Sequence, residues 1–87
     1  MHGNLYLRNG GELKNKVKKY LKTKTRYEIH QIVKHPDLTE DEKWLIYYTY
    51  GEKRYVANTC AKLNISERHF YNIQDVALTK LYYILNL

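Results

Sequence analysis

Apolar residues in this 87-residue chain return at the spacing of an α-helix. The clearest case is a set at i, i+4, i+7 and i+8 that falls on one helical face, with lysines around the rest: Leu13, Val17, Tyr20 and Leu21. We therefore expect a first helix from about residue 11 to residue 22. Glycine occurs four times and proline once, so few residues interrupt such helices. The sequence predicts an all-α chain of about five helices.

Two capping boxes mark where further helices begin. Thr25 and Glu28 have the T-x-x-E spacing, in which each side chain accepts a hydrogen bond from the other residue's backbone N–H. This pattern predicts a helix from Arg26 that stops before Pro36, whose ring disfavours a helical conformation in the preceding residue. The residues expected to face inward are Ile29, Ile32 and Val33.

The same capping pattern returns at Thr39 and Glu42, and the first turn there carries three acids, which the helix dipole favours. We expect a third helix from about Glu40 to Gly51, with Gly51 as its C-terminal cap. The residues on or near its buried stripe are Trp44, Leu45, Tyr47 and Tyr48.

The chain is long enough for one domain and too short for two. Residues 1–11 end in Asn9-Gly10-Gly11, a turn signal with no periodic apolar face behind it, and predict a flexible or loosely packed N-terminal arm. Residues 12–87 are expected to form a single helical domain.

Residues 55–75 have the spacing of a helix-turn-helix. This motif needs a small residue where its helices cross, a turn residue four positions later that tolerates a left-handed backbone, and apolar anchors along the second helix. Cys60 is the small residue and Asn64 the turn residue, since asparagine is among the few non-glycine residues that adopt positive φ. Ser66 stands at the N-cap of the second, long helix. The anchors are Leu63, Ile65, Phe70 and Ile73.

Residues 38–85 resemble region 4 of bacterial sigma factors and, more closely, the sigma-like phage transcriptional activators of the ArpU and RinA type. The likeness lies in Leu-Thr-Glu-Asp-Glu at 38–42, Leu-Asn-Ile-Ser at 63–66, Phe-Tyr at 70–71 and Ala-Leu-Thr-Lys-Leu at 77–81. It covers a little over half of the chain. The resemblance implies a transcriptional regulator that binds double-stranded DNA, encoded by a phage or another mobile element, and contact with RNA polymerase.

If the second helix of the motif enters the major groove, its exposed N-terminal residues face the base edges. Arg68 is placed to bind guanine through two hydrogen bonds, Asn72 to bind adenine, and Glu67 to accept from a cytosine amino group. The alternative is that Glu67 and Arg68 are a solvated first turn. The full set of expected base contacts is Ser66, Glu67, Arg68, His69, Tyr71 and Asn72.

The net charge of +6 lies entirely in residues 1–38, which hold nine Lys or Arg and three acids; residues 39–87 hold six of each. Phosphate contacts provide most non-specific affinity for DNA, so we expect them from this basic half and from the residues before residue 55. The alternative for the lysine run is a solubilising surface. The expected backbone contacts are Lys14, Lys18, Lys19, Lys22, Lys53 and Arg54, with Lys16 and Lys24 as further candidates in the run.

Ten tyrosines are an unusually large number for a chain of this length. Tyrosine packs like an apolar residue and keeps a polar tip, so most are expected in the core and a surplus at an interface. A homodimer or partner surface is expected near the C-terminus, at Tyr82, Tyr83, Leu85 and Leu87. A rival function follows from it: a small inhibitor or adaptor that uses a helix-turn-helix scaffold to bind a host protein, for example a nucleic-acid enzyme.

Residue types for catalysis and metal binding are sparse. The four histidines and the single cysteine show no paired ligand spacing, and there is no glycine-rich phosphate loop. We therefore expect no enzyme activity, no metal site and no cofactor. The chain has a single cysteine, no long apolar segment and no secretory signal at its start. These features predict a cytoplasmic protein without a membrane partner. If a phage encodes it, the cytoplasm is that of the bacterial host.

Overall fold

The computed structural model describes residues 2–87, with side chains from Gly11 onward, and Met1 lies outside the described residues. Five α-helices follow one another: α1 (His2–Lys22), α2 (Arg26–Ile32), α3 (Glu40–Ile46), α4 (Val56–Leu63) and α5 (Glu67–Ile84). A π-helical turn, η1 (Tyr47–Gly51), continues α3 directly. Residues 2–87 contain no strand, so the predicted all-α class with about five helices is confirmed.

The two capping boxes are confirmed atom by atom. At α2 the Thr25 hydroxyl accepts from the Glu28 N–H at 3.1 Å, and the Glu28 carboxylate accepts from the Thr25 N–H at 2.9 Å. At α3 the corresponding distances between Thr39 and Glu42 are 3.2 and 2.9 Å. Each box satisfies backbone donors that a helix start otherwise leaves unpaired. The starts of both helices are therefore encoded within four residues of sequence.

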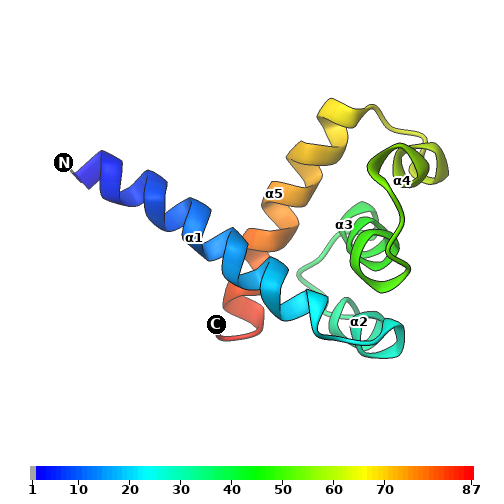
Figure 1. Cartoon of the computed structure of the whole chain (residues 1–87), viewed down its shortest axis with the longest axis horizontal. Helices are drawn as coiled ribbons and strands as arrows, with labels where there is room; N and C mark the ends of the chain where they lie inside the picture. The colour runs from blue at the N-terminus through cyan, green and yellow to red at the C-terminus, as the bar shows by residue number, and fades with distance from the viewer. Residues whose placement is uncertain (1) are drawn as a thin grey trace.

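The expected start of the first helix at residue 11 is wrong. α1 begins at His2 and runs through Asn9, Gly10 and Gly11 without interruption. Once a helix has a nucleus, each added residue costs little, and glycine weakens a helix by only about 1 kcal/mol. In Figure 1 the N-terminal half of α1 projects clear of the other helices. The residues predicted as a loose arm thus extend α1 beyond the core.

Gly51 also differs from expectation. The sequence predicts it as the C-terminal cap, but it lies inside η1, and the nearest residue with positive φ is Lys53, at φ 56°. A Cβ at Gly51 would lie 3.2 Å from Cδ1 of Tyr47 and 3.5 Å from Cβ of Ile29. The missing side chain of Gly51 therefore allows the Tyr47 ring and Ile29 of α2 to lie close to the end of η1.

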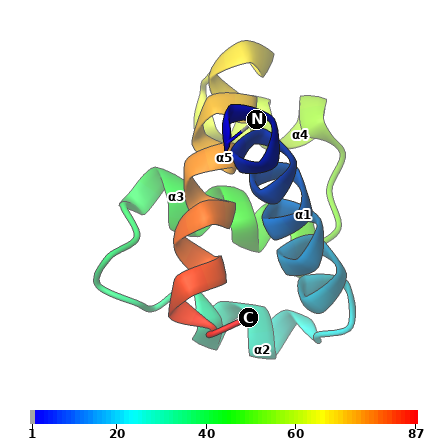
Figure 2. The same ribbon diagram turned by 90° about the vertical axis from the view of Figure 1, so that its left-hand side faces the viewer.

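The core gathers around α5, which packs against α1, α3 and α4. Figure 2 shows α1 and α5 side by side, with α2 below them. The buried apolar side chains come from every helix: Val17, Leu21, Ile29, Val33, Leu38, Leu45, Ile46, Tyr50, Cys60, Phe70, Ala77, Leu78 and Leu81. This set contains residues from every predicted helix. Trp44 corrects one expectation: it was placed on or near the buried stripe of the third helix, but it is 39% exposed and stacks on Tyr48 at 5.6 Å between ring centres, and Ile46 is buried instead.

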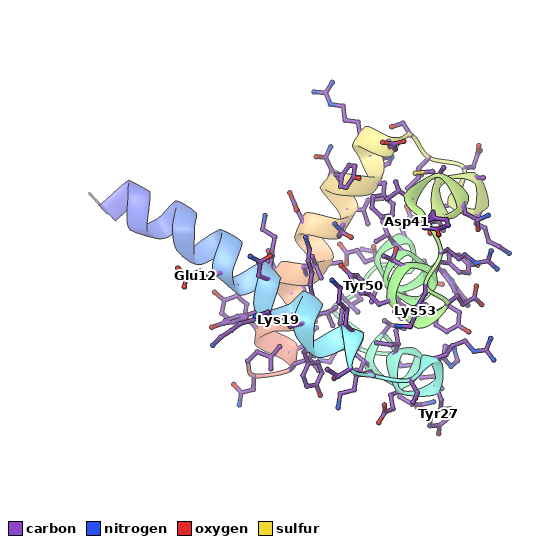
Figure 3. All side chains as sticks on the ribbon, in the orientation of Figure 1. Glu12, Lys19, Tyr27, Asp41, Tyr50 and Lys53 are labelled. Atoms are coloured by element: carbon purple, nitrogen blue, oxygen red, sulfur yellow. The ribbon has the colours of Figure 1, made fainter. Side chains whose placement is uncertain are left out.

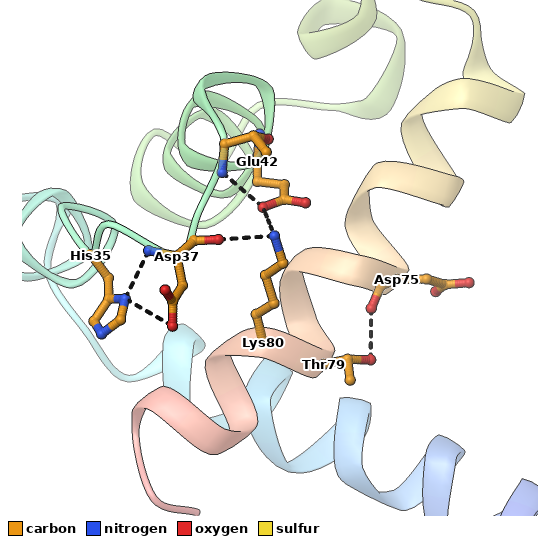
Figure 4. Close-up of polar contacts among 7 residues, drawn as sticks. His35, Asp37, Glu42, Asp75, Thr79 and Lys80 are labelled. Atoms are coloured by element: carbon orange, nitrogen blue, oxygen red, sulfur yellow. Dashed lines mark hydrogen bonds and ion pairs between the residues drawn. The ribbon is translucent and has the colours of Figure 1, made fainter.

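An ion pair ties the end of α5 to the start of α3 (Figure 4). The Lys80 ammonium donates to the Glu42 carboxylate and to the Asp37 carbonyl, both at 2.9 Å. Glu42 is only 6% exposed, and its charge is balanced by the Lys80 ammonium and by the Thr39 N–H of its capping box. Lys80 therefore connects α5 to the segment before α3 and to the first turn of α3.

Candidate nucleic-acid interface

The connection between α4 and α5 has the local geometry expected from sequence. Asn64 ends α4 in the left-handed conformation, with φ 57° and ψ 50°. Ser66 is the N-cap of α5, and its hydroxyl accepts from the His69 N–H at 3.1 Å. The Ile65 N–H donates back to the Cys60 carbonyl at 3.1 Å, which closes the end of α4. The turn and the cap therefore set the direction in which α5 leaves α4.

Cys60, in the last turn of α4, is buried. Burial raises the pKa of its thiol, and the Glu67 carboxylate raises it further. The thiol therefore stays protonated and packs as a small apolar group. The preceding residue, Thr59, is fully buried as well, which the sequence pattern did not predict.

The six residues expected to contact bases are all exposed on the first turns of α5 or at its cap. Between them Phe70 points inward and is only 1% exposed, and the Tyr71 ring meets it edge-on at 5.1 Å. Arg68 and Asn72 are four residues apart and so share one helical face. Among the described residues, Arg68 and Glu67 form no ion pair, so their charged groups remain available to a ligand.

The acid that follows these residues on α5 is paired. The Lys14 ammonium of α1 lies 3.3 Å from the Asp75 carboxylate, on a partly exposed part of the surface. This pair lowers the negative potential on the middle of α5. It also directs Lys14, one of the expected phosphate contacts, toward α5.

The other lysines of α1 lie on different faces. Lys19 and Lys22 are exposed, and Lys18 is half-buried on the side of the buried residues Val17 and Leu21. Figure 3 labels Lys19 on the part of α1 that crosses α5, and Figure 1 shows that this crossing lies at the C-terminal half of α5. Lys16 is exposed as well, and the Lys24 ammonium lies 4.6 Å from the centre of the Tyr20 ring. The structure therefore separates these cations from the first turn of α5.

Lys53 and Arg54 lie in the loop between η1 and α4. Lys53 is exposed, whereas Arg54 is held in place: its Nε donates to the Glu52 carboxylate at 2.5 Å and its Nη1 to the Asn58 side-chain oxygen at 2.6 Å. The guanidinium also lies 5.7 Å from the centre of the Tyr48 ring. The hydrogen bond from Arg54 lowers the pKa of Glu52, against an opposing effect of burial. Glu52 therefore stays ionised and keeps Arg54 in position.

A shallow depression with a volume of about 710 Å³ lies beside this loop, and we call it the basic groove. Its lining comes from the start of α2, the end of η1, the loop and the first turn of α4: Arg26, Gly51, Glu52, Lys53, Arg54, Tyr55 and Asn58. The sequence predicted Lys53 and Arg54 as functional and missed the others. The spacing of Glu52 and Asn58 around Arg54 was a signal for their role, but nothing in the sequence placed Arg26 beside them.

The C-terminal residues expected at an interface do not behave alike. Tyr83 is 69% exposed, and Tyr82, which meets it edge-on at 5.2 Å between ring centres, is half-buried. Leu85 and Leu87 are half-buried and pack against the core. Much of the apolar surface of these two leucines is thus already used within the chain. Tyr83 is the one of the four that presents a largely free side chain.

Two further properties concern the described part of the chain. None of its helices is long and apolar enough to cross a membrane. Its His, Cys, Asp and Glu side chains form no group of three that would hold a metal ion. Comparisons with models of known protein families, with curated proteins and with solved structures gave no match.

Proposed function

We propose that this chain is a sequence-specific DNA-binding protein that regulates transcription, in which α4 and α5 act as a helix-turn-helix. The observation that carries the proposal is the surface at the start of α5. Six polar or aromatic side chains are exposed there, on a helix whose entry is fixed by the left-handed Asn64 and the Ser66 cap. Phe70 anchors the same turns in the core, so the exposed residues are held on a rigid support.

Base recognition in this proposal rests on the first two turns of α5. Side chains on one face of a helix in the major groove meet successive base pairs, and Arg68 and Asn72 share such a face. Arginine binds guanine and asparagine binds adenine, each through two hydrogen bonds. Glu67 adds a preference for a cytosine amino group. Lys53 and Arg54 bind DNA phosphates beside the major groove and fix the orientation of the chain on the duplex.

The transcriptional role comes from the resemblance of residues 38–85 to sigma region 4 and to phage activators. In this proposal the chain acts on phage or mobile-element genes in a bacterial cytoplasm, and it contacts RNA polymerase. The near-neutral charge of α5 makes the lysines of α1 the main long-range attraction toward DNA, since diffusional approach depends on the field of the whole chain.

Selection of bound sites from a random duplex library tests the proposal and yields a target sequence. With that target, Arg68→Ala or Asn72→Ala should each weaken binding by about 1–3 kcal/mol, because each removes a two-hydrogen-bond contact to one base. The matched controls are Lys34→Ala and Gln31→Ala, an exposed cation and an exposed amide on or just after α2. These should leave the affinity unchanged. A chain that selects no site at low salt, or variants that bind as tightly as the original, would contradict DNA reading by α5.

One observation favours a second function, the binding of a host protein as an inhibitor or adaptor. Tyr83 exposes most of a large ring beside Tyr82, and such rings are frequent anchors of protein interfaces. In a pull-down, a partner retained by the original chain should be lost with Tyr83→Ala and kept with Tyr27→Ala, an equally exposed tyrosine on α2. Equal loss or equal retention with both variants would exclude Tyr83 as the anchor.

A further inference from the structure

The basic groove brings together three cations from separate segments. Arg26 begins α2, whereas Lys53 and Arg54 belong to the loop that precedes α4. Arg26 and Lys53 are exposed, and Arg54 is partly covered. The one acid in the lining, Glu52, is already hydrogen-bonded to Arg54, so the groove keeps a surplus of positive charge. A shallow, open site with this charge suits an anion.

Arg54 is fixed before any ligand arrives. Glu52 and Asn58 accept hydrogen bonds from two of its five guanidinium N–H groups, and its Cζ lies 5.7 Å from the centre of the Tyr48 ring. A planar fork that is already oriented loses little conformational entropy when it binds an oxyanion. Guanidinium groups match the geometry of phosphate oxygens in particular, because two parallel N–H groups meet two oxygens.

We propose that the basic groove binds one phosphate group, held by Arg54 together with Arg26 and Lys53, with Glu52 and Asn58 as positioning residues. The backbone of a DNA duplex supplies this phosphate, which rests on the proposed function. A free phosphorylated small molecule offers the same chemistry. Arg26 is the new member of the site, and it joins α2 to the nucleic-acid interface.

Inorganic pyrophosphate tests the groove without DNA. Added to the ¹⁵N-labelled full chain, it should shift the amide signals of Arg26 and of residues 51–58 in a saturable way, whereas potassium chloride at equal ionic strength should not. Arg54→Gln should weaken this binding about tenfold, the effect of losing charge-assisted hydrogen bonds. Lys34→Gln, an exposed cation outside the groove, should leave it unchanged.

A second variant keeps the test valid if Arg54→Gln disturbs the loop. The double substitution Arg26→Gln with Lys53→Gln changes two exposed side chains and should weaken pyrophosphate binding while the rest of the amide spectrum stays in place. Glu52→Gln should also weaken binding, because it frees Arg54 from its position, although it makes the groove more positive. Stronger binding by Glu52→Gln would overturn the positioning role. Unsaturable shifts, or equal affinity in the groove variants and in Lys34→Gln, would overturn the phosphate site.

A selected duplex then identifies the source of the phosphate. If the duplex supplies it, Arg54→Gln and the double variant should weaken duplex binding, and pyrophosphate should compete with DNA at the groove. Duplex affinity unaffected by both variants would overturn the duplex as the source and leave a free phosphorylated molecule. Saturable pyrophosphate binding by a chain that binds no duplex would support the groove and contradict the proposed function. Duplex binding without pyrophosphate binding would support the proposed function and overturn the phosphate site.

Discussion

Tyr50 illustrates how burial alters a single residue. Its side chain lies in the core at 8% exposure, and this burial raises its pKa from 10.0 to about 12. The unfolded chain therefore ionises at Tyr50 first as the pH rises, and it binds fewer protons than the folded chain between the two values. By linkage, the contribution of Tyr50 to stability is complete below pH 10 and is lost as the pH rises toward 12.

We expect Tyr50→Phe to reduce this loss of stability. The free energy of unfolding, measured with urea from pH 9 to pH 12, should fall less steeply above pH 10 in Tyr50→Phe than in the original chain. Tyr27→Phe, which changes an exposed tyrosine, should keep the original slope. Tyrosinate absorbance offers a second check, since Tyr50→Phe should remove an ionisation near pH 12. Identical slopes in all three proteins would show that Tyr50 titrates like an exposed residue.

Lys53 adopts a conformation that is costly for a residue with a Cβ. A left-handed backbone costs a non-glycine residue about 1–2 kcal/mol, and Asn64 meets the same requirement with a better-suited side chain. Gly51, two residues before Lys53, does not have positive φ, and its missing Cβ leaves space for Tyr47 and Ile29. Sequence reasoning placed the glycine near the end of the helix correctly and gave the wrong reason for it.

At the scale of elements, α1 differs most from what its sequence indicated. Asn9-Gly10-Gly11 is a turn signal when read locally, yet α1 runs through it from His2. A Cβ at Gly11 would meet no atom within 4 Å, so no packing demand explains this glycine. The C-terminal half of α1 is held against the core by Val17, Tyr20 and Leu21, and the helix continues from this half toward His2.

The helical state of Gly11 makes a prediction. Gly11→Ala should raise the helix content and increase the free energy of unfolding by about 0.5–1 kcal/mol, because alanine loses less backbone entropy in a helix and fits without a clash. Circular dichroism and urea unfolding measure both quantities. Gly51→Ala is the matched comparison and should gain less, since its Cβ would lie 3.2 Å from the Tyr47 ring. No gain at Gly11 would indicate that residues before Glu12 are not helical in solution.

At the scale of the molecule, two ion pairs join helices that are distant in sequence. Lys80 connects α5 to the start of α3 through Glu42, and Lys14 connects α1 to α5 through Asp75. The two lysines are similarly exposed, but the Glu42 side chain of the first pair is 8% exposed and the Asp75 side chain of the second is 59% exposed. Their contributions should differ accordingly, because screening by solvent reduces exposed pairs to between 0 and about 1 kcal/mol.

Lys80→Met should lower the free energy of unfolding by about 1–3 kcal/mol, since the Glu42 carboxylate would stay buried without its cation. Urea unfolding at neutral pH measures the change. The control is Lys43→Met, which breaks an ion pair of 3.7 Å with the exposed Glu40 and should cost less than about 0.5 kcal/mol. Equal effects of the two substitutions would contradict a structural role for the buried pair.

The sequence by itself determined the features that depend on neighbours within a few residues: the two capping boxes, the left-handed Asn64, the Ser66 cap and the apolar stripes. Hydrogen bonds across three or four residues and the pitch of a helix are local properties, so they can be read from spacing alone. The tertiary structure decided where charges meet. It paired Lys14 with Asp75, committed Lys80 to Glu42, and placed Arg26 in one groove with Arg54. These contacts depend on how helices cross, which the packing of the whole core determines.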